Sequence, residues 1–385
     1  MAGLALDVSD SLVRTIWENS LDREVRASDP LLDPDSGLAG NSPNSLVIQR
    51  DELAKQGGGT LRVSFRYQNR SRGRAGDEVM KGHESAPEFS TMDIVVNTLR
   101  NAFAISSPIQ DQWILPDAMD ESRDAASDWA ASRLSFALHA HATGLSGITD
   151  DAYRLHNAIA AVNSEYIIRP EGKAADSLTE NDTFDVGLLR DAMQRVQLMR
   201  PKIRPAQTPW GPKFAVFISP EQAFSLKQSD SAWYGAMIAA LQGGDKGSGV
   251  FTRALGSFDD FLIFVSDFVP PGLNTAGTAI ASGTRRAWVG GAGALTTVFG
   301  RGWKVAPGYS PNRWSWVRES EDYDHQHAVC VRSILGVKRP RFTRPGESSA
   351  RENGVLVIET AAPVPDGMDD AVLYQDWTDA GLTIA

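Results

Sequence analysis

The stretch that decides the fold is residues 285–360, which read RRAWVGGAGALTTVFGRGWKVAPGYSPNRWSWVRESEDYDHQHAVCVRSILGVKRPRFTRPGESSARENGVLVIET. Within it, Trp314–Val317 and His327–Ile334 alternate apolar and polar side chains with the two-residue period of half-buried strands. Arg285–Val289 and Gly354–Glu359 are short apolar runs of the same kind. Because glycine and proline separate these runs, the stretch is predicted to be a set of strands joined by turns.

Composition limits the class of protein. The chain has 385 residues, 42% hydrophobic and 22% charged, with a net charge of −10, so a folded protein is expected and binding to nucleic acid along the whole chain is not. Its single cysteine, Cys330, cannot form an intrachain disulfide, and its apolar surroundings predict a small buried hydrophobe made in a reducing cytoplasm. We expect neither a signal peptide nor a membrane span, because no apolar run approaches about 18 residues.

The N-terminal third contains an arm and a ribbon. Residues 1–50 are poor in aromatic side chains, so they are expected to be disordered or laid over another surface. Residues 60–67 and 89–96 alternate as two strands of a long ribbon, and residues 69–76 form its polar tip. A long hairpin needs a surface to lie on, and its arginines suit carboxylates of a neighbouring subunit. These predicted contact residues are Arg62, Arg66, Arg70, Arg72 and Arg74. The alternatives are a solvated hairpin in an ordinary domain and arginines that bind nucleic acid.

The strongest helix signal covers residues 117–142. Asp117 is the predicted N-cap and Gly144 follows the end, which gives a helix about 39 Å long at 1.5 Å per residue. His139 and His141 are expected to decorate its C-terminal end as cations near the negative end of the helix dipole. Thr183 is expected to cap a second amphipathic helix, and a third begins with Ser219-Pro220-Glu221-Gln222, a capping box. A further helix is predicted near residues 231–241.

One cluster has the residue types of a metal site: Asp322, Asp324, His325 and His327. Alternation along a strand places the two aspartates on one face and the two histidines on the other, so the four do not easily converge on one ion. A metal-dependent hydrolase built on them is therefore a minor alternative. The glycine-rich residues 243–249 lack the spacing of a phosphate-binding loop. We predict no catalytic residue, no resident metal and no cofactor.

Four blocks carry a family resemblance: VFTRALGSFDDFLIFVSDF (250–268), RRAWVGGAGAL (285–295), WVRESEDYDHQHAVCVRSILGVKRPRF (316–342) and GVLVIETAAP (354–363). In this order the chain resembles the major capsid proteins of tailed bacteriophages, and within them the large-podophage-type coat proteins, from about residue 57 to residue 362. Arg253 stands where the family usually has a second glycine, and Gly293-Ala294-Leu295 replaces a block that usually contains glutamine.

The resemblance implies an α+β protein of the Hong Kong 97-type fold. Its expected parts are an N-terminal arm (1–56), an extended loop (57–105), a peripheral domain (106–182) with a spine helix (117–142), an axial domain (183–330), strands returning to the peripheral domain (331–362) and a solvated acidic tail (363–385). It also implies a function without catalysis, in which copies form the pentamers and hexamers of an icosahedral shell around double-stranded DNA. Portal, scaffolding and cement proteins are the implied partners, the virion is the location, and assembly takes place in the host cytoplasm. An encapsulin-like shell around protein cargo is the main alternative.

Overall fold

The structure is a computed structural model, which describes most of the chain. The described residues are 20–26, 29–33, 36–56, 58–66, 72–84, 86, 89–105, 118–199, 202–229, 234–235, 254–302, 304–305, 308–309, 312–321, 326–343, 349–364 and 367–384. Within these ranges, no helix combines the length and the apolar character needed to cross a membrane.

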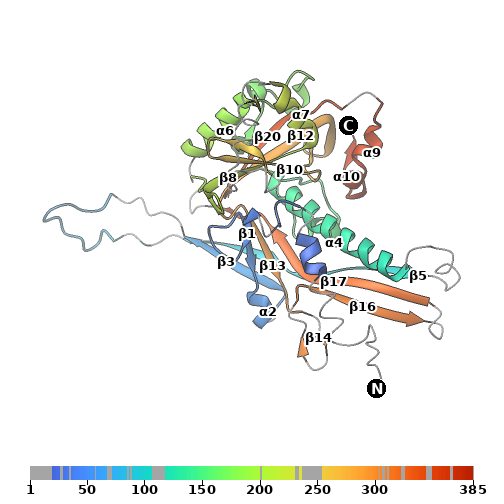
Figure 1. Ribbon diagram of the computed structural model, residues 1–385. Helices are drawn as coiled ribbons and strands as arrows, with labels where there is room; N and C mark the ends of the chain where they lie inside the picture. Colours follow the sequence, from blue (N-terminus) through green and yellow to red (C-terminus); the bar gives the residue numbers. More distant parts are fainter. Residues whose placement is uncertain are drawn as a thin grey trace.

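A nine-stranded sheet forms the larger of two folded units (Figure 1). Its path runs through β6 (Ile167–Ile168), β20 (Val355–Ala361), β12 (Ala279–Gly290), β8 (Gly211–Ile218), β10 (Phe261–Val265) and β9 (Ala254–Phe258), with β11 (Pro271–Leu273) and β21 (Thr383–Ile384) on β12 and β7 (Ala206–Thr208) on β8. Every residue of β20 is buried, as the apolar sequence VLVIETA predicts for a central strand. Helices α6 (Val186–Leu198) and α7 (Pro220–Ser229) flank this sheet.

A six-stranded sheet forms the second unit. Its order is β1 (Ala39–Gly40), β2 (Val47–Arg50), β13 (Leu295–Phe299), β17 (Gln326–Lys338) and β16 (Trp314–Glu321), with β5 (Asn97–Ile105) also paired to β17. The 13-residue β17 is the organising strand, because β16, β13 and β5 all hydrogen-bond to it. The strands predicted from the alternation in residues 314–317 and 327–334 are therefore confirmed.

Shorter elements connect these units. They are α2 (Glu52–Gln56), α5 (Asp151–Arg154), the 3-10 turns at Ser164–Tyr166, Pro170–Gly172 and Ala175–Ser177, the strand pairs β14 (Lys304–Val305) with β15 (Gly308–Tyr309) and β18 (Arg341–Phe342) with β19 (Arg351–Glu352), and the C-terminal helices α9 (Asp370–Leu373) and α10 (Gln375–Asp379).

The long helix α4 (Ala118–Thr143) joins the two sheets. It has 26 residues and contacts β5 and β17 of the smaller sheet as well as β12 and β20 of the larger one. Ala126, Ala130 and Ala137 are completely buried, and such small side chains let both sheets approach the helix axis closely. The helix ends at Gly144, whose φ of 73° is the left-handed conformation that glycine adopts without strain. The predicted helix is confirmed, while its predicted cap Asp117 lies outside the described residues.

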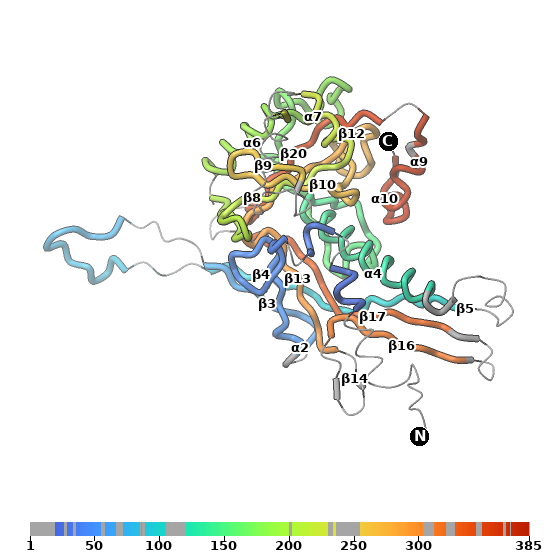
Figure 2. The backbone as a smooth tube through the Cα atoms, viewed as in Figure 1, coloured from blue at the N-terminus to red at the C-terminus, as the bar shows by residue number. Residues whose placement is uncertain are grey.

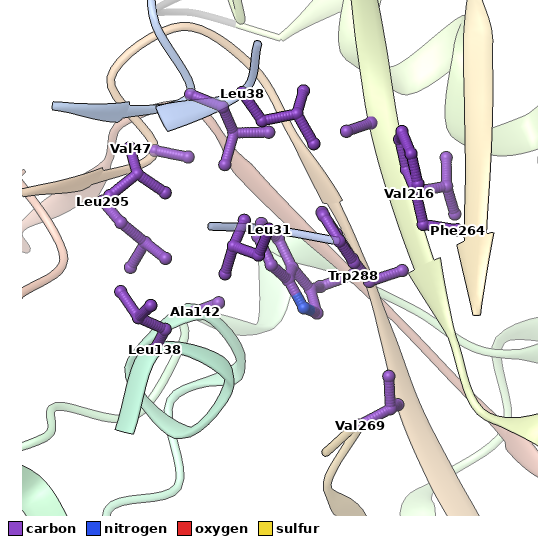
Figure 3. Close-up of a cluster of buried hydrophobic side chains, with 14 of the residues drawn as sticks. Leu31, Leu38, Val47, Leu138, Ala142, Val216, Phe264, Val269, Trp288 and Leu295 are labelled. Carbon is purple, nitrogen blue, oxygen red and sulfur yellow. The ribbon is translucent and has the colours of Figure 1, made fainter. Parts of the chain in front are cut away.

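Part of the N-terminal region belongs to the core. Leu31 and Leu38 are fully buried, and Figure 3 places Leu31 between Leu138 of α4 and Trp288 of β12, with Leu38 farther from the helix, towards Val47 of β2. Strand β2 pairs in parallel with β13, so this region also completes the smaller sheet. Residues 29–33 and 36–50 thus lie over their own subunit, and their buried leucines supply one layer of the shared core.

Two expectations about boundaries are wrong. The stretch 183–330 does not form one unit, because β13 and β16 belong to the six-stranded sheet; β20 in turn belongs to the nine-stranded sheet. The chain crosses between the sheets several times, and local sequence patterns carry no signal for which sheet a strand joins. The cap of α6 also differs: the carboxylate of Asp185 accepts the hydrogen bond from the N–H of Leu188 at 2.8 Å, whereas Thr183 bridges to Ala361.

The C-terminal segment is folded and not a solvated tail. Tyr374 and Trp377 are buried, and the Trp377 ring stacks on Phe136 of α4 with their centroids 4.0 Å apart. Strand β21 then pairs in parallel with β12. Asp376 and Asp379 of α10 are exposed, while Tyr374 and Trp377 between and beside them face the core, a short apolar pattern that the acidic composition obscured in the sequence.

We expect Trp377→Ala to destabilise the unassembled subunit by about 3 kcal/mol, because it removes a buried indole and leaves a cavity beside Phe136. Urea unfolding followed by tryptophan fluorescence measures this change. Val372→Ala, at a site that is 70% exposed, is the matched control and should leave the unfolding midpoint unchanged. Equal stability of Trp377→Ala and the wild type would contradict the packing role of this segment.

Candidate assembly interface

A two-stranded ribbon stands out from the body of the molecule (Figures 1 and 2). Strand β3 (Thr60–Arg66) pairs with β4 (Phe89–Val95) in antiparallel register. The alternation read from the sequence is confirmed, since one face of the ribbon is apolar and packs on Val298 and Ile334 of the smaller sheet. That face comprises Leu61, Val63, Phe65, Met92 and Ile94. The opposite face points away from the subunit.

Polar contacts fix the base of the ribbon. The side-chain amide of Asn157 accepts from the N–H of Val95 and donates to its carbonyl, both at 2.9 Å, as a neighbouring strand would. Gly336 of β17 faces the same residue, and a Cβ at this glycine would lie 2.1 Å from the Val95 carbonyl oxygen. The Nζ of Lys338 donates to the carbonyl of Asp93 at 2.8 Å. Neither Asn157 nor Gly336 carried a sequence signal for this role, because their partners are more than 60 residues away.

Three of the five predicted contact arginines, Arg62, Arg72 and Arg74, approach carboxylates within the ribbon and its tip. The guanidinium of Arg62 forms two hydrogen bonds to the carboxylate of Asp93, directly opposite on β4, at 2.7 and 2.9 Å. Those bonds hold the pKa of Asp93 below its usual value. In the tip, Arg74 contacts Glu78 at 3.2 Å and Arg72 approaches it at 3.9 Å. Arg66 is exposed at the end of β3, and Arg70 lies outside the described residues.

His139 is buried in a polar network rather than placed at an exposed helix end. The indole N–H of Trp288 donates to its Nδ1 at 2.9 Å, so the ring proton is on Nε2 and is donated to the Asp29 carboxylate at 3.1 Å. Asp29 also accepts from the N–H of Leu31 and the hydroxyl of Ser266. Burial raises the pKa of Asp29, but the interaction with His139 and the hydrogen bonds outweigh it and leave that pKa below the usual value.

The network contains Ser266, His139 and Asp29, but their arrangement is not that of a nucleophilic triad. In a triad the carboxylate orients one ring nitrogen while the other accepts the serine proton. Here Asp29 and Ser266 both lie at Nε2, at 3.1 and 3.3 Å, and Nδ1 is occupied by Trp288. No nitrogen is left to take a proton from the hydroxyl, and all four side chains are buried. The network ties the N-terminal segment to α4 and to the larger sheet.

A second buried cluster surrounds His141 at the end of α4. Arg339, just after β17, donates to the carbonyls of His141 and Ala142, which the helix itself leaves unpaired, and pairs with Glu352 at 2.9 Å. Burial lowers the pKa of Arg339 to about 10. His141 donates from Nε2 to the carbonyl of Arg154 at 2.9 Å, and burial lowers its pKa to about 4, helped by the charge of Arg339. The expected cationic role of this histidine is therefore wrong.

The proposed metal cluster is mostly outside the described residues, which exclude Asp322, Asp324 and His325. The backbone of His327 lies in β17, opposite Ser320 of β16 and Ile105 of β5. Across the described ranges, no group of three or more His, Cys, Asp or Glu is arranged to hold a metal ion. Cys330 is half-buried in the same strand, where burial raises the pKa of its thiol.

Solved structures with a similar fold are shells of bacteriophages. The capsid of Ralstonia phage GP4 matches with a TM-score of 0.71 and 20% identity, over 86% of this chain and 92% of that one. The capsid of cyanophage Pam1 matches with a TM-score of 0.63 and 16% identity, over 84% and 91% of the two chains. The head of Helicobacter pylori bacteriophage KHP40 matches with a TM-score of 0.58 and 14% identity, over 87% and 92%. The chain therefore has the Hong Kong 97-type fold of shell-forming proteins.

A family model described as phage capsid protein matches residues 7–364, so the chain belongs to the phage capsid protein family. Its function is that of a major capsid protein, a structural subunit of the shell. The search of curated proteins found no match.

The buried His141 predicts a specific loss of stability in acid. Its pKa is about 4 in the folded subunit and about 6.5 when unfolded, so below pH 6.5 the unfolded state binds more protons and stability falls as the pH drops towards 4. Between pH 7 and pH 5, we expect the free energy of unfolding of His141→Gln to fall by about 2 kcal/mol less than that of the wild type. Urea titrations of unassembled subunits at each pH measure this difference. His83→Gln, at an exposed site, should keep the wild-type pH profile. An unchanged profile in His141→Gln would refute the assignment.

Proposed function

We propose that this chain builds an icosahedral head from pentamers and hexamers, and that the head encloses the double-stranded DNA of a tailed phage. The observation that carries the proposal is the family match over residues 7–364, to which the fold adds a ribbon projecting from a compact body. Many weak contacts suffice in such a shell, because closure of a symmetric assembly makes every contact cooperative with the others.

In this proposal the ribbon lies over a neighbouring subunit. Its inner face is packed on its own six-stranded sheet, so its outer face and tip are the parts open to another molecule. The contact set is Arg62, Arg66, Arg70, Arg72 and Arg74. Because Arg62 and Arg74 already have carboxylate partners at the surface, they contribute charge around the contact more than binding free energy.

The two sheets take different roles. The nine-stranded unit acts as the axial domain, meeting its copies around the fivefold and sixfold axes, and the six-stranded unit with α4 acts as the peripheral domain. Because α4 contacts both sheets, a tilt of this helix during expansion of a precursor shell would move the two units together. The network of Asp29, His139 and Trp288 keeps the N-terminal segment attached to the helix during such a change.

Assembly in the host cytoplasm, with portal, scaffolding and cement proteins as partners, completes the proposal. The encapsulin-like alternative differs in cargo, since it predicts enclosed protein and no DNA. Membership of the phage capsid family favours the DNA-containing head.

Electron microscopy of particles made with the neighbouring genes, together with a nuclease-protection assay, tests the cargo. We expect closed shells that protect double-stranded DNA. Shells that contain only protein would favour the compartment, and a subunit that stays monomeric under every condition would reject both.

Reversing the tip charges tests the ribbon contact. We expect Arg70→Glu, Arg72→Glu and Arg74→Glu together to block shell formation while the subunits stay soluble, because carboxylates on both sides of a contact repel each other. Sedimentation measures the assembled fraction. The matched control reverses Arg190, Lys202 and Arg204, three exposed cations outside the ribbon, and should still give shells. Normal heads from the tip variant would show that the tip arginines are not needed for the contact between subunits.

A further inference from the structure

Exposed apolar side chains are concentrated on the ribbon. Among the residues that the structure describes, nine large hydrophobic side chains are exposed, and four of these lie between residues 79 and 95. They are Val79 (72% exposed), Met80 (54%), Phe89 (58%) and Val95 (43%). Phe89 and Val95 belong to β4, whereas Val79 and Met80 are adjacent in the tip, and two adjacent exposed apolar side chains form a candidate interaction surface.

In the structure the tip of the ribbon includes residues 72–84, beyond the residues 69–76 expected from the sequence, and Val79 and Met80 lie in a part of it with defined local structure. On one side, Arg74 pairs with Glu78 at 3.2 Å. On the other, the carbonyl of Met80 accepts from the N–H of His83 at 3.0 Å, closing a turn in which Gly82 has a φ of 87°. A turn with positive φ at this third position favours glycine. The two apolar residues are thus held between an ion pair and a turn, and both side chains point to solvent.

The subunit cannot cover this tip itself. Figures 1 and 2 show residues 72–84 extending away from both sheets, and Val79 and Met80 are 72% and 54% exposed, so the described part of the chain leaves both side chains uncovered. In a shell, the molecules next to a projecting loop are other copies of the same chain. Arg72 and Arg74 precede the apolar pair within the tip, and Lys81 follows it. An apolar centre with charged residues around it is the usual composition of a protein contact.

We propose that Val79 and Met80 form an apolar plug that inserts into a second copy of this chain when the shell assembles. The inference rests on the proposed function and adds the residues that supply most of the binding free energy of the ribbon contact. The nearby arginines then direct the approach, and the buried apolar side chains hold the two subunits together.

Removing the plug tests the proposal. We expect Val79→Ser with Met80→Ser to lower the yield of shells at least tenfold, while unassembled subunits unfold as the wild type does, because neither side chain packs within the subunit. The matched control is Met368→Ser with Val372→Ser, which removes the same two residue types at sites that are 59% and 70% exposed. This control should assemble normally. Equal yields from the two variants, whether both high or both low, would overturn the plug.

Cross-linking identifies the partner. In a Cys330→Ser background, which has no other cysteine, Met80→Cys carries a benzophenone probe, and subunits labelled with ¹⁵N are mixed with unlabelled ones before assembly. We expect cross-linked peptides that pair one labelled with one unlabelled chain, and only in assembled shells. Links confined to a single chain would refute the inference. If the wild type and the variant Val79→Ser with Met80→Ser both form shells, the plug alone is overturned. A wild type that never assembles would count against the proposed function and the plug with it.

Discussion

The burial of α4 between two sheets is the constraint on which the rest of the subunit depends. A helix with small side chains on several faces can be covered from both sides, and here β5 and β17 cover one side and β12 and β20 another. Buried polar groups in such an arrangement need hydrogen-bond partners, and several have them: His139 accepts a hydrogen bond from Trp288 and donates one to Asp29, and Arg339 donates to the carbonyls at the helix end. These bonds connect three distant parts of the chain, at Asp29, Trp288 and Arg339, to one helix.

The ribbon is the contrasting part of the molecule. One face of β3 and β4 belongs to the subunit, and its base is held by Asn157, Gly336 and Lys338. Its tip has local turns and ion pairs but no covering layer, so it presents apolar side chains to water. A rigid base with an uncovered tip is what a subunit needs if part of its stability comes from its neighbours. Exposed ion pairs contribute little binding free energy and buried apolar side chains contribute more. Val79 and Met80 are therefore stronger candidates for the contact than the arginines.

Acid affects the body and the ribbon differently. His141 is buried as a neutral ring and opposes protonation, whereas Asp29 is buried as a carboxylate and is stabilised by its donors. Lowering the pH therefore weakens the buried contacts around α4. It has less effect on the exposed ribbon, because the ion pairs there contribute little to stability. If the ribbon makes the proposed contact, the stability of the subunit and the contact between subunits depend on separate groups.

The sequence by itself determined the strands of residues 314–317, 327–334 and 355–359, the long helix, the capping box at Ser219 and the alternating ribbon, because each depends on neighbours within a few residues. The order of its packing motifs also indicated the family. Only the tertiary structure decided which sheet each strand joins, that Tyr374 and Trp377 are buried, and that His139 meets Asp29 and Trp288 across more than 100 residues. It also decided that Arg62 pairs with Asp93 across the two strands of the ribbon and Arg74 with Glu78 in the tip. These outcomes depend on contacts between distant segments, and local periodicity or composition contains no information about such partners.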